Sequence, residues 1–221
     1  MTATKAACDR LILLDGATGS GKSTVLEHAR HHDSGRFGVV RKVTDRPRRL
    51  SDNDWEFEFR QEVPDDGDHV RWSSVGWQYA LPTATIEGLL HAGRIPVVIC
   101  TDPSVIALLR EAYTVVVVYV YRPLTPDELE RLLVLRGTVG PDAAARRLEH
   151  HAVVRDYAGR IAEIDAVLLN IGTTADLTDQ FDQVARALTV PGRSVDQAAP
   201  MPYQRRGARD VGDAEADQLV E

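Results

Sequence analysis

The residues with the clearest chemistry stand near the start of the chain, where residues 16–23 fit the pattern G-x-x-x-x-G-K-[ST] at every position. Glycines in such a segment let the backbone curl, so that successive N–H groups point inward and surround an anion. A lysine then supplies a point charge for phosphate groups, and a serine hydroxyl can bind Mg²⁺. The pattern predicts a loop for nucleotide phosphates, with Lys22 and Ser23 in these two roles.

The segments that flank this loop agree with the prediction. An apolar run at 11–14 indicates a buried strand before the loop, and residues 22–31 indicate a helix whose positive N-terminal end faces the anion. Beyond them, apolar runs that predict strands alternate with amphipathic stretches that predict helices. The further strands are expected at 37–43, 96–101, 115–121 and 166–170, and the helices at 83–92, 103–112, 126–135, 141–155 and 176–188. This alternation predicts an α/β domain with a mostly parallel sheet.

Two groups of arginines could surround the phosphates. Residues 41–49 carry five positive side chains against one aspartate, and Arg136 and Arg147 flank a turn that contains Gly137 and Gly140. A glycine-bounded turn between two helices is typical of a lid that closes over a substrate. Since phosphoryl transfer needs several cations around the migrating group, we expect both groups at an anion site.

Composition excludes several other classes of protein. The 221 residues are 43% hydrophobic and 27% charged, which is typical of a folded soluble domain. The longest apolar run, at 115–121, is far shorter than the roughly 18 residues of a membrane span. No secretory signal is visible, and Cys8 and Cys100 cannot form a disulfide framework. We therefore expect a cytoplasmic protein with no membrane partner, and the net charge of −7 argues against a nucleic-acid partner.

Over roughly residues 9–190 the chain resembles the guanylate kinase superfamily. An ordered series of motifs carries the resemblance: GATGSGKST from Gly16, TDRPRR from Thr44, WEF from Trp55, the residues Trp72, Gly76 and Tyr79, LHAGRIPVVICTDP from Leu90, LRGT from Leu135, ARRL from Ala145 and VLLN from Val167. The resemblance implies a P-loop NTPase fold: a mostly parallel five-stranded sheet with flanking helices, a small acceptor-binding β subdomain at about 41–82 and a helical lid at about 135–148. Residues 1–8 would be an N-terminal extension, and the proline-rich segment 191–221 a mobile C-terminal tail.

The same resemblance implies ATP and Mg²⁺ as cofactors and assigns roles to residues that match the motifs. The ATP-binding set is Gly16, Ala17, Thr18, Gly19, Ser20, Gly21, Lys22, Ser23 and Thr24, with Asn170 near the adenine, and Ser23 is also the metal ligand. The catalytic set is Lys22, the lid residues Arg136 and Arg147, and Asp102 at the end of a strand that faces both substrates.

For the acceptor phosphate, the superfamily uses two arginines three residues apart and two tyrosines. Arg46 and Arg49 have this spacing, whereas Arg48 matches if the proline is taken as the anchor, so the choice stays open. Trp55 and Tyr79 match the tyrosines. Tyr79 can bond a phosphate through its hydroxyl, but Trp55 offers only an indole N–H.

The chain departs from the superfamily where guanine is read. A glutamate would precede the tryptophan and accept hydrogen bonds from the base, but here Arg71 precedes Trp72, and arginine has only donors. Ala80 and Leu81 follow Tyr79 where a hydroxyl residue is expected. These changes predict that GMP is a poor acceptor, and that Arg71 pairs with an extra anionic group on the true acceptor.

The interpretation is an ATP-dependent phosphotransferase that acts on a small phosphorylated acceptor. One alternative is a ribose 1,5-bisphosphate phosphokinase forming phosphoribosyl diphosphate, because those enzymes resemble the chain in the phosphate loop and in the Trp72–Tyr79 stretch without the glutamate. The others are a guanylate kinase proper, a non-catalytic guanylate-kinase-like binding module, and a switch that hydrolyses ATP slowly. Monomer and homodimer are equally compatible with the sequence.

One weaker signal concerns two histidines. His28 and His32 lie four residues apart on the first predicted helix, so they could share a metal ion. No third ligand stands nearby in the sequence, and we therefore expect an exposed helix face at this point.

Overall fold

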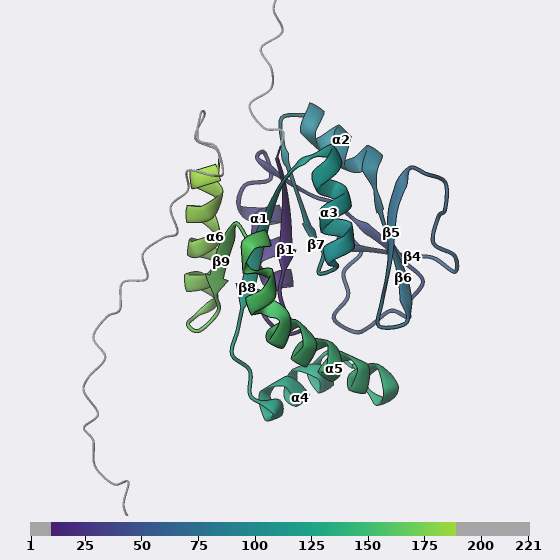
Figure 1. Ribbon diagram of the computed structural model, residues 1–221, viewed down its shortest axis with the longest axis vertical. Helices are drawn as coiled ribbons and strands as arrows, with labels where there is room; N and C mark the ends of the chain where they lie inside the picture. Colours follow the sequence, from purple (N-terminus) through teal and green to yellow (C-terminus); the bar gives the residue numbers. More distant parts are fainter. Residues whose placement is uncertain (1–9, 189–221) are drawn as a thin grey trace, which may run out of the picture.

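A parallel sheet of five strands forms the centre of the computed structural model, which describes residues 10–188 (Figure 1). Its strands are β1 (Arg10–Asp15), β2 (Phe37–Val39), β7 (Ile95–Ile99), β8 (Thr114–Tyr121) and β9 (Ala166–Leu169), in the spatial order β2-β7-β1-β8-β9. Every pairing is parallel; for example, Ile12 lies beside Val97 on one side and Val116 on the other. The predicted α/β fold with a five-stranded sheet is confirmed.

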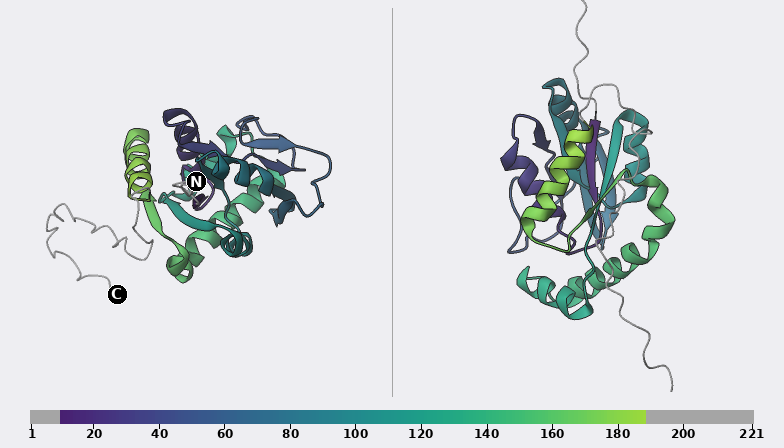
Figure 2. Two further views of the ribbon diagram at one scale, coloured as in Figure 1. Left: turned by 90° about the horizontal axis from the view of Figure 1, so that it is seen from above. Right: turned by 90° about the vertical axis from the view of Figure 1, so that its left-hand side faces the viewer.

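Helices cover both faces of this sheet (Figure 2). On one face, α1 (Lys22–His32) and α6 (Thr174–Leu188) pack on Ile12 and Leu14 of β1. On the other, α2 (Thr83–His91) and α3 (Pro103–Ala112) pack on Leu11 and Leu13. Because successive side chains of a strand point to opposite faces, the continuous apolar run of β1 supplies both cores.

A second, four-stranded sheet stands beside the first, in the segment predicted to be a small β subdomain. It contains β3 (Lys42–Thr44), β4 (Phe57–Phe59), β5 (His69–Ser74) and β6 (Trp77–Pro82), in the order β4-β3-β6-β5. The prediction of one strand over 37–43 was wrong, because β2 ends at Val39 and β3 begins at Lys42 in the other sheet. The chain changes sheet at Val40, which is fully buried and bonds Val97, and at Arg41, which is exposed.

The helical lid consists of α4 (Pro126–Leu135) and α5 (Gly140–Asp156), followed by the 3₁₀ helix η1 (Tyr157–Glu163). Both helices lie at one end of the central sheet (Figure 1). The helix predicted over 126–135 is confirmed, and it starts with a capping box, in which the Thr125 side chain and Glu128 bond each other's backbone N–H groups. The lid helices extend beyond the predicted segment of about 135–148.

The predicted N-terminal extension at 1–8 and C-terminal tail at 191–221 lie outside the described residues. Within residues 10–188, no helix is both long and apolar enough to cross a membrane.

Candidate active site

An open cleft lies where the two sheets and the lid meet. Its walls come from the loop after β1, from the β3–β4 and β5–β6 segments, from the end of β7, and from the lid. This is the carboxyl edge of the parallel sheet, which is where α/β folds place their ligands. Six positive side chains line the cleft against two carboxylates, although the whole chain carries a net charge of −7. The cleft is therefore built for anions.

The loop after β1 has the backbone of an anion nest. Gly16 and Gly21 have φ of 131° and 110°, which L side chains rarely adopt. A Cβ atom at Gly16 would also lie 2.3 Å from the carbonyl oxygen of Val120 on β8. Of the nine predicted loop positions, six line the cleft and three do not: Gly16, Thr18, Gly19, Gly21, Lys22 and Ser23 line it, whereas Ala17, Ser20 and Thr24 do not.

Lys22 opens α1 at the base of the cleft. Its Nζ donates to the carbonyl oxygens of Gly16 and Ala17 at 2.6 and 2.8 Å. Burial lowers the pKa of Lys22 to about 8, and the negative charges of Glu149 and Asp15 offset only part of this shift. The ammonium group is thus held away from water, and the negative charge of an incoming phosphate would stabilise it.

Asn170 follows β9 and supports the loop from behind. Its Nδ2 donates to the Ser20 carbonyl at 2.8 Å, and a Cβ atom at Gly21 would lie 2.6 Å from the same nitrogen. Asn170 does not line the cleft. Its predicted place near the adenine therefore stays a prediction, and its contact in the structure is with the loop backbone.

The arginines of the β3–β4 segment separate into two inside the cleft and one outside. Arg46 is 4% exposed, makes a bidentate ion pair with Asp52 at 2.6 and 2.7 Å, and lies over the ring of Phe57. Burial alone would lower the pKa of Arg46, but its hydrogen bonds to Asp52 raise the pKa above its usual value. Arg49 also lines the cleft, whereas Arg48 is exposed and pairs with Asp54. Of the alternatives left open by the sequence, Arg46 and Arg49 are the pair at the cleft.

Of the two arginines predicted for the lid, Arg136 lines the cleft and Arg147 does not. Arg136 lines the cleft, and its guanidinium makes no hydrogen bond or ion pair with any side chain among residues 10–188. Burial, together with the charge of Arg49, lowers the pKa of Arg136. Arg147 points away from the cleft and pairs with Glu130 at 2.5 Å, with 40% of its side chain exposed.

The neighbouring Arg146 occupies the place expected of Arg147. Arg146 is 9% exposed, lines the cleft, and pairs with Glu149 at 2.7 Å and with the Tyr79 hydroxyl at 3.5 Å. Burial alone would lower the pKa of Arg146, but Glu149 and Tyr79 raise it. Arg146 shares a buried stripe of α5 with Ala143 and His150, and Arg147 lies outside that stripe. The position of each arginine around α5 therefore decides which one faces the cleft.

On the β5–β6 hairpin, Tyr79 lies at the cleft and Arg71 does not. Tyr79 is 6% exposed and stacks on Trp72, with ring centroids 5.4 Å apart. Trp72 and Ser74 line the cleft, so Arg71, one residue before Trp72 in the strand, points to the opposite face and pairs with Asp65 at 2.6 Å. The expectation that Arg71 contacts the acceptor is therefore not supported by its position.

Two more predicted residues stand apart from the cleft lining. Trp55 packs on the core beneath α1, and the Arg30 guanidinium lies over its ring at 5.3 Å. Asp102 caps α3: its carboxylate accepts from the backbone N–H groups of Ser104 and Val105. The cap uses the carboxylate that was predicted to face both substrates. Cys100 and Thr101, just before it, line the cleft instead.

Sequence reasoning missed a buried ion pair in the cleft wall. Lys42 and Glu56 are 5% and 4% exposed, and Lys42 Nζ lies 3.2 Å from Glu56 Oε1. The same ammonium donates to the Ile99 carbonyl and lies 4.5 Å from the centre of the Phe57 ring. Nothing in the sequence pairs Glu56 with Lys42, which stands 14 residues before it.

The lid is joined to the phosphate loop by two further contacts that the sequence did not indicate. The Thr18 hydroxyl donates to Glu149 at 3.1 Å, and His150 Nδ1 lies 3.0 Å from the Thr18 carbonyl. Glu149 thus contacts both the loop and Arg146.

Burial of Cys100 raises the pKa of its thiol to about 12, so this cysteine is protonated and does not act as a nucleophile.

No family model matches the chain. The PhnN ribose 1,5-bisphosphate phosphokinase of Bradyrhizobium diazoefficiens is 34% identical over 184 residues, which cover 80% of this chain and 88% of that protein. The guanylate kinase of Streptomyces coelicolor is 30% identical over 167 residues, covering 73% and 83% of the two chains.

A solved structure shows the same fold at lower identity. The crystal structure of guanylate kinase from Anaplasma phagocytophilum superimposes with a TM-score of 0.59 at 17% identity, and covers 84% of this chain and 89% of that one.

Proposed function

The chain belongs to the guanylate kinase superfamily and is a kinase, and we propose that it transfers the γ-phosphoryl group of ATP to a phosphate of a small sugar bisphosphate such as ribose 1,5-bisphosphate. The main support is the positive charge on one side of the cleft, which we call the acceptor side. It is formed by Lys42, Arg46, Arg49, Trp72 and Tyr79. Three cations meet there, and each is paired with a carboxylate for which an acceptor phosphate would compete: Lys42 with Glu56, Arg46 with Asp52 and Arg49 with Asp142.

The other side of the cleft fits a nucleoside triphosphate and its metal ion. The loop glycines adopt the backbone of an anion nest, the Ser20 hydroxyl is buried without a hydrogen-bond partner, and Lys22 supplies the charge. Ser23 lines the cleft and would hold Mg²⁺ through its hydroxyl. When bound, this ion would neutralise charge on the β- and γ-phosphates.

The reaction needs no protein base. A phosphate monoester is largely a dianion at neutral pH, because its second pKa is about 6. One of its oxygens attacks the γ-phosphorus, the bond from that phosphorus to the β–γ bridging oxygen breaks, and ADP leaves with the bonding electrons. The product is a diphosphate on the acceptor. Lys22, Arg136 and Arg146 would stabilise the charge on the migrating group, which is the main task of a protein in phosphoryl transfer.

The acceptor side is poorly suited to guanine. The base needs an acceptor for its N1–H and amino group, and the carboxylates that line the cleft are Glu56 and Glu149. Lys42 engages Glu56, while Arg146 and Thr18 engage Glu149. Turning either toward a base would leave a buried cation without its partner, which costs several kcal/mol, roughly 3–5 for a buried pair. A second phosphate would instead add favourable pairing with Lys42.

The test is an acceptor panel with the tag-free full chain. ADP release is measured with ATP–Mg²⁺ and ribose 1,5-bisphosphate, ribose 5-phosphate, GMP or AMP, and the product is identified by ³¹P NMR. We expect diphosphate formation from ribose 1,5-bisphosphate, with kcat/KM about a hundredfold or more above that for GMP. Ribose 5-phosphate lacks the C1 phosphate and controls for it.

Each alternative has its own outcome. Preference for GMP would indicate a guanylate kinase proper. ADP release that no acceptor increases would indicate a slow ATP-hydrolysing switch, and failure to bind ATP–Mg²⁺ would indicate a binding module. Any of these three results would overturn the proposal.

A further inference from the structure

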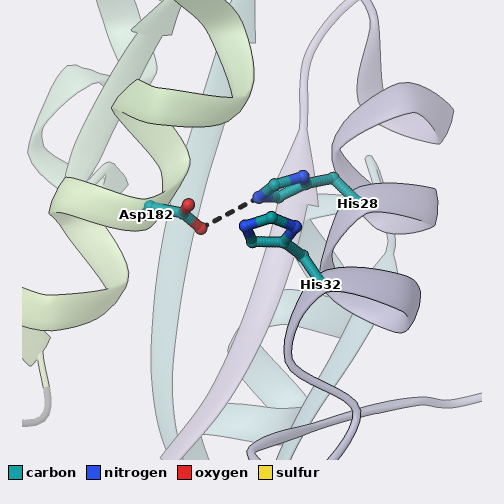
Figure 3. Close-up of side chains that lie close together, drawn as sticks. All are labelled: His28, His32 and Asp182. Carbon is teal, nitrogen blue, oxygen red and sulfur yellow. Dashed lines mark hydrogen bonds and ion pairs between the residues drawn. The ribbon is translucent and has the colours of Figure 1, made fainter. Parts of the chain in front are cut away.

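Two histidines of α1 and one aspartate of α6 meet on the face of the central sheet that these two helices cover. His28 Nε2 lies 3.0 Å from Asp182 Oδ1, and the His28 and His32 rings stack with centroids 4.6 Å apart. Figure 3 shows ring nitrogens of both histidines turned toward the carboxylate. The third ligand that the sequence lacked near His28 is thus supplied by Asp182, 154 residues along the chain.

The donor set is that of a transition-metal site. One ligand atom from each of the three residues lies within 4.8 Å of the other two. Zinc bonds imidazole nitrogen and carboxylate oxygen at about 2.0–2.2 Å, so the ligand atoms of a tetrahedral site stand roughly 3.3 Å apart. His28 and Asp182 are already at this spacing. His32 is exposed at the last turn of α1, where its side chain can rotate by the remaining distance.

Packing fixes two of the three ligands before any ion binds. The ring of His28 meets the fully buried Phe181 edge-on, with centroids 6.3 Å apart. The side chains of His28 and Asp182 are only 15% and 23% exposed. Little side-chain entropy would therefore be lost on binding, and the exposed side of the cluster leaves room for water as a fourth ligand.

We propose that His28, His32 and Asp182 form a divalent transition-metal site that joins α1 to α6. Two neutral imidazoles and a carboxylate favour Zn²⁺ and its neighbours in the first row over Mg²⁺ or Ca²⁺, which prefer all-oxygen ligands. The ion would lie at the C-terminal end of α1, where the helix dipole favours a positive charge. Lys22 and Ser23 stand at the opposite end of the same helix, roughly 15 Å away for ten residues. The site is therefore separate from the cleft.

A bound ion would act on stability rather than on chemistry. Helices α1 and α6 cover the same face of the sheet, and the cluster bridges their outer surfaces. An ion that binds only the folded chain raises its melting temperature in proportion to the logarithm of ion concentration over Kd. We expect one equivalent of Zn²⁺ per chain, with a Kd on the order of micromolar and a rise in melting temperature of several degrees.

The experiment uses the tag-free full chain without nucleotide. Zn²⁺ binding is measured by calorimetry, Co²⁺ binding by its visible absorption, and the melting temperature with and without Zn²⁺. His32→Ala and Asp182→Asn each remove one ligand at a position that is not fully buried, so both variants should fold. We expect each to weaken Zn²⁺ binding at least tenfold and to abolish the metal-dependent rise in melting temperature.

His31→Ala is the matched control. His31 is the next residue on the same helix, is exposed, and contacts Arg30 rather than the cluster. Its variant should bind Zn²⁺ within about twofold of the wild type. Equal affinities of the wild type and His32→Ala would overturn the site, and so would loss of binding in His31→Ala. An unchanged melting temperature at saturating Zn²⁺ would overturn the joining of α1 to α6.

Discussion

Asp142 of the lid accepts two hydrogen bonds from the guanidinium of Arg49, from Nε at 3.1 Å and from Nη2 at 2.7 Å. The contact spans 93 residues and joins α5 to the segment between β3 and β4. Arg49 is also one of the two arginines at the acceptor side of the cleft. A lid carboxylate therefore occupies the group that an acceptor phosphate would bind.

This pairing predicts the effect of Asp142→Asn. The variant removes a charge that competes with the acceptor phosphate for Arg49, so the acceptor KM should fall about threefold or more, with kcat less affected. Initial rates at varied acceptor concentration measure both constants. In an Arg49→Ala background the same substitution should change KM by less than about twofold. An equal fall in both backgrounds would show that Asp142 acts through another residue.

Lys22 predicts how ATP binding depends on pH. Its pKa is lowered to about 8 in the unliganded protein, and only the charged ammonium attracts phosphate. The charged form predominates below pH 8 and is lost above it, so the Kd for ATP should rise about tenfold per pH unit above pH 8. Calorimetry at pH 8 in buffers of different ionisation enthalpy should also detect proton uptake on binding. A Kd that is flat from pH 7 to 9.5 would contradict the prediction.

The buried pair of Lys42 and Glu56 predicts separate effects on stability and on acceptor binding. Lys42→Met leaves the Glu56 carboxylate buried without its cation, which should lower the free energy of unfolding by about 3–5 kcal/mol. Lys42→Met combined with Glu56→Gln removes both charges and should recover most of that loss in urea denaturation. The double variant still lacks the cation, so its acceptor KM should stay at least tenfold raised. Recovery of both properties would mean that Lys42 is structural only.

The elements that the sequence predicts well are those set by local chemistry. The phosphate loop needs glycine at fixed positions, and the capping box at Thr125 needs only residues three apart. Both are decided within one turn of backbone, so their residue types identify them. The parallel sheet follows similarly, because continuous apolar runs such as that of β1 must be covered on both faces.

The predictions that failed depend on which way a side chain points from its element, or on partners that lie far away in the sequence. Arg71 was placed at the acceptor by its position beside Trp72, but neighbouring residues of a strand face opposite ways, and Trp72 takes the inward place. Asp102 follows the end of β7 as predicted, yet it does not line the cleft, and the helix after it uses its carboxylate as a cap. Asp182 could not be linked to His28 from the sequence, because only the packing of α6 on α1 brings them together.

The last prediction concerns the two adjacent arginines of the lid. Arg146 lines the cleft and contacts Tyr79 and Glu149, whereas Arg147 points outward to Glu130. Arg146→Ala should lower kcat about a hundredfold or more, since loss of one preorganised cation at a developing charge typically costs about 3 kcal/mol. Arg147→Ala removes a surface ion pair, typically about 0–1 kcal/mol, and should change kcat less than about threefold.

The two variants lose the same atoms one residue apart, so each controls for the other. Melting temperatures measured beside the kinetics separate a loss of fold from a loss of catalysis. A large fall in kcat for Arg147→Ala, with Arg146→Ala nearly normal, would mean that α5 turns by about one residue, roughly 100°, when substrates bind.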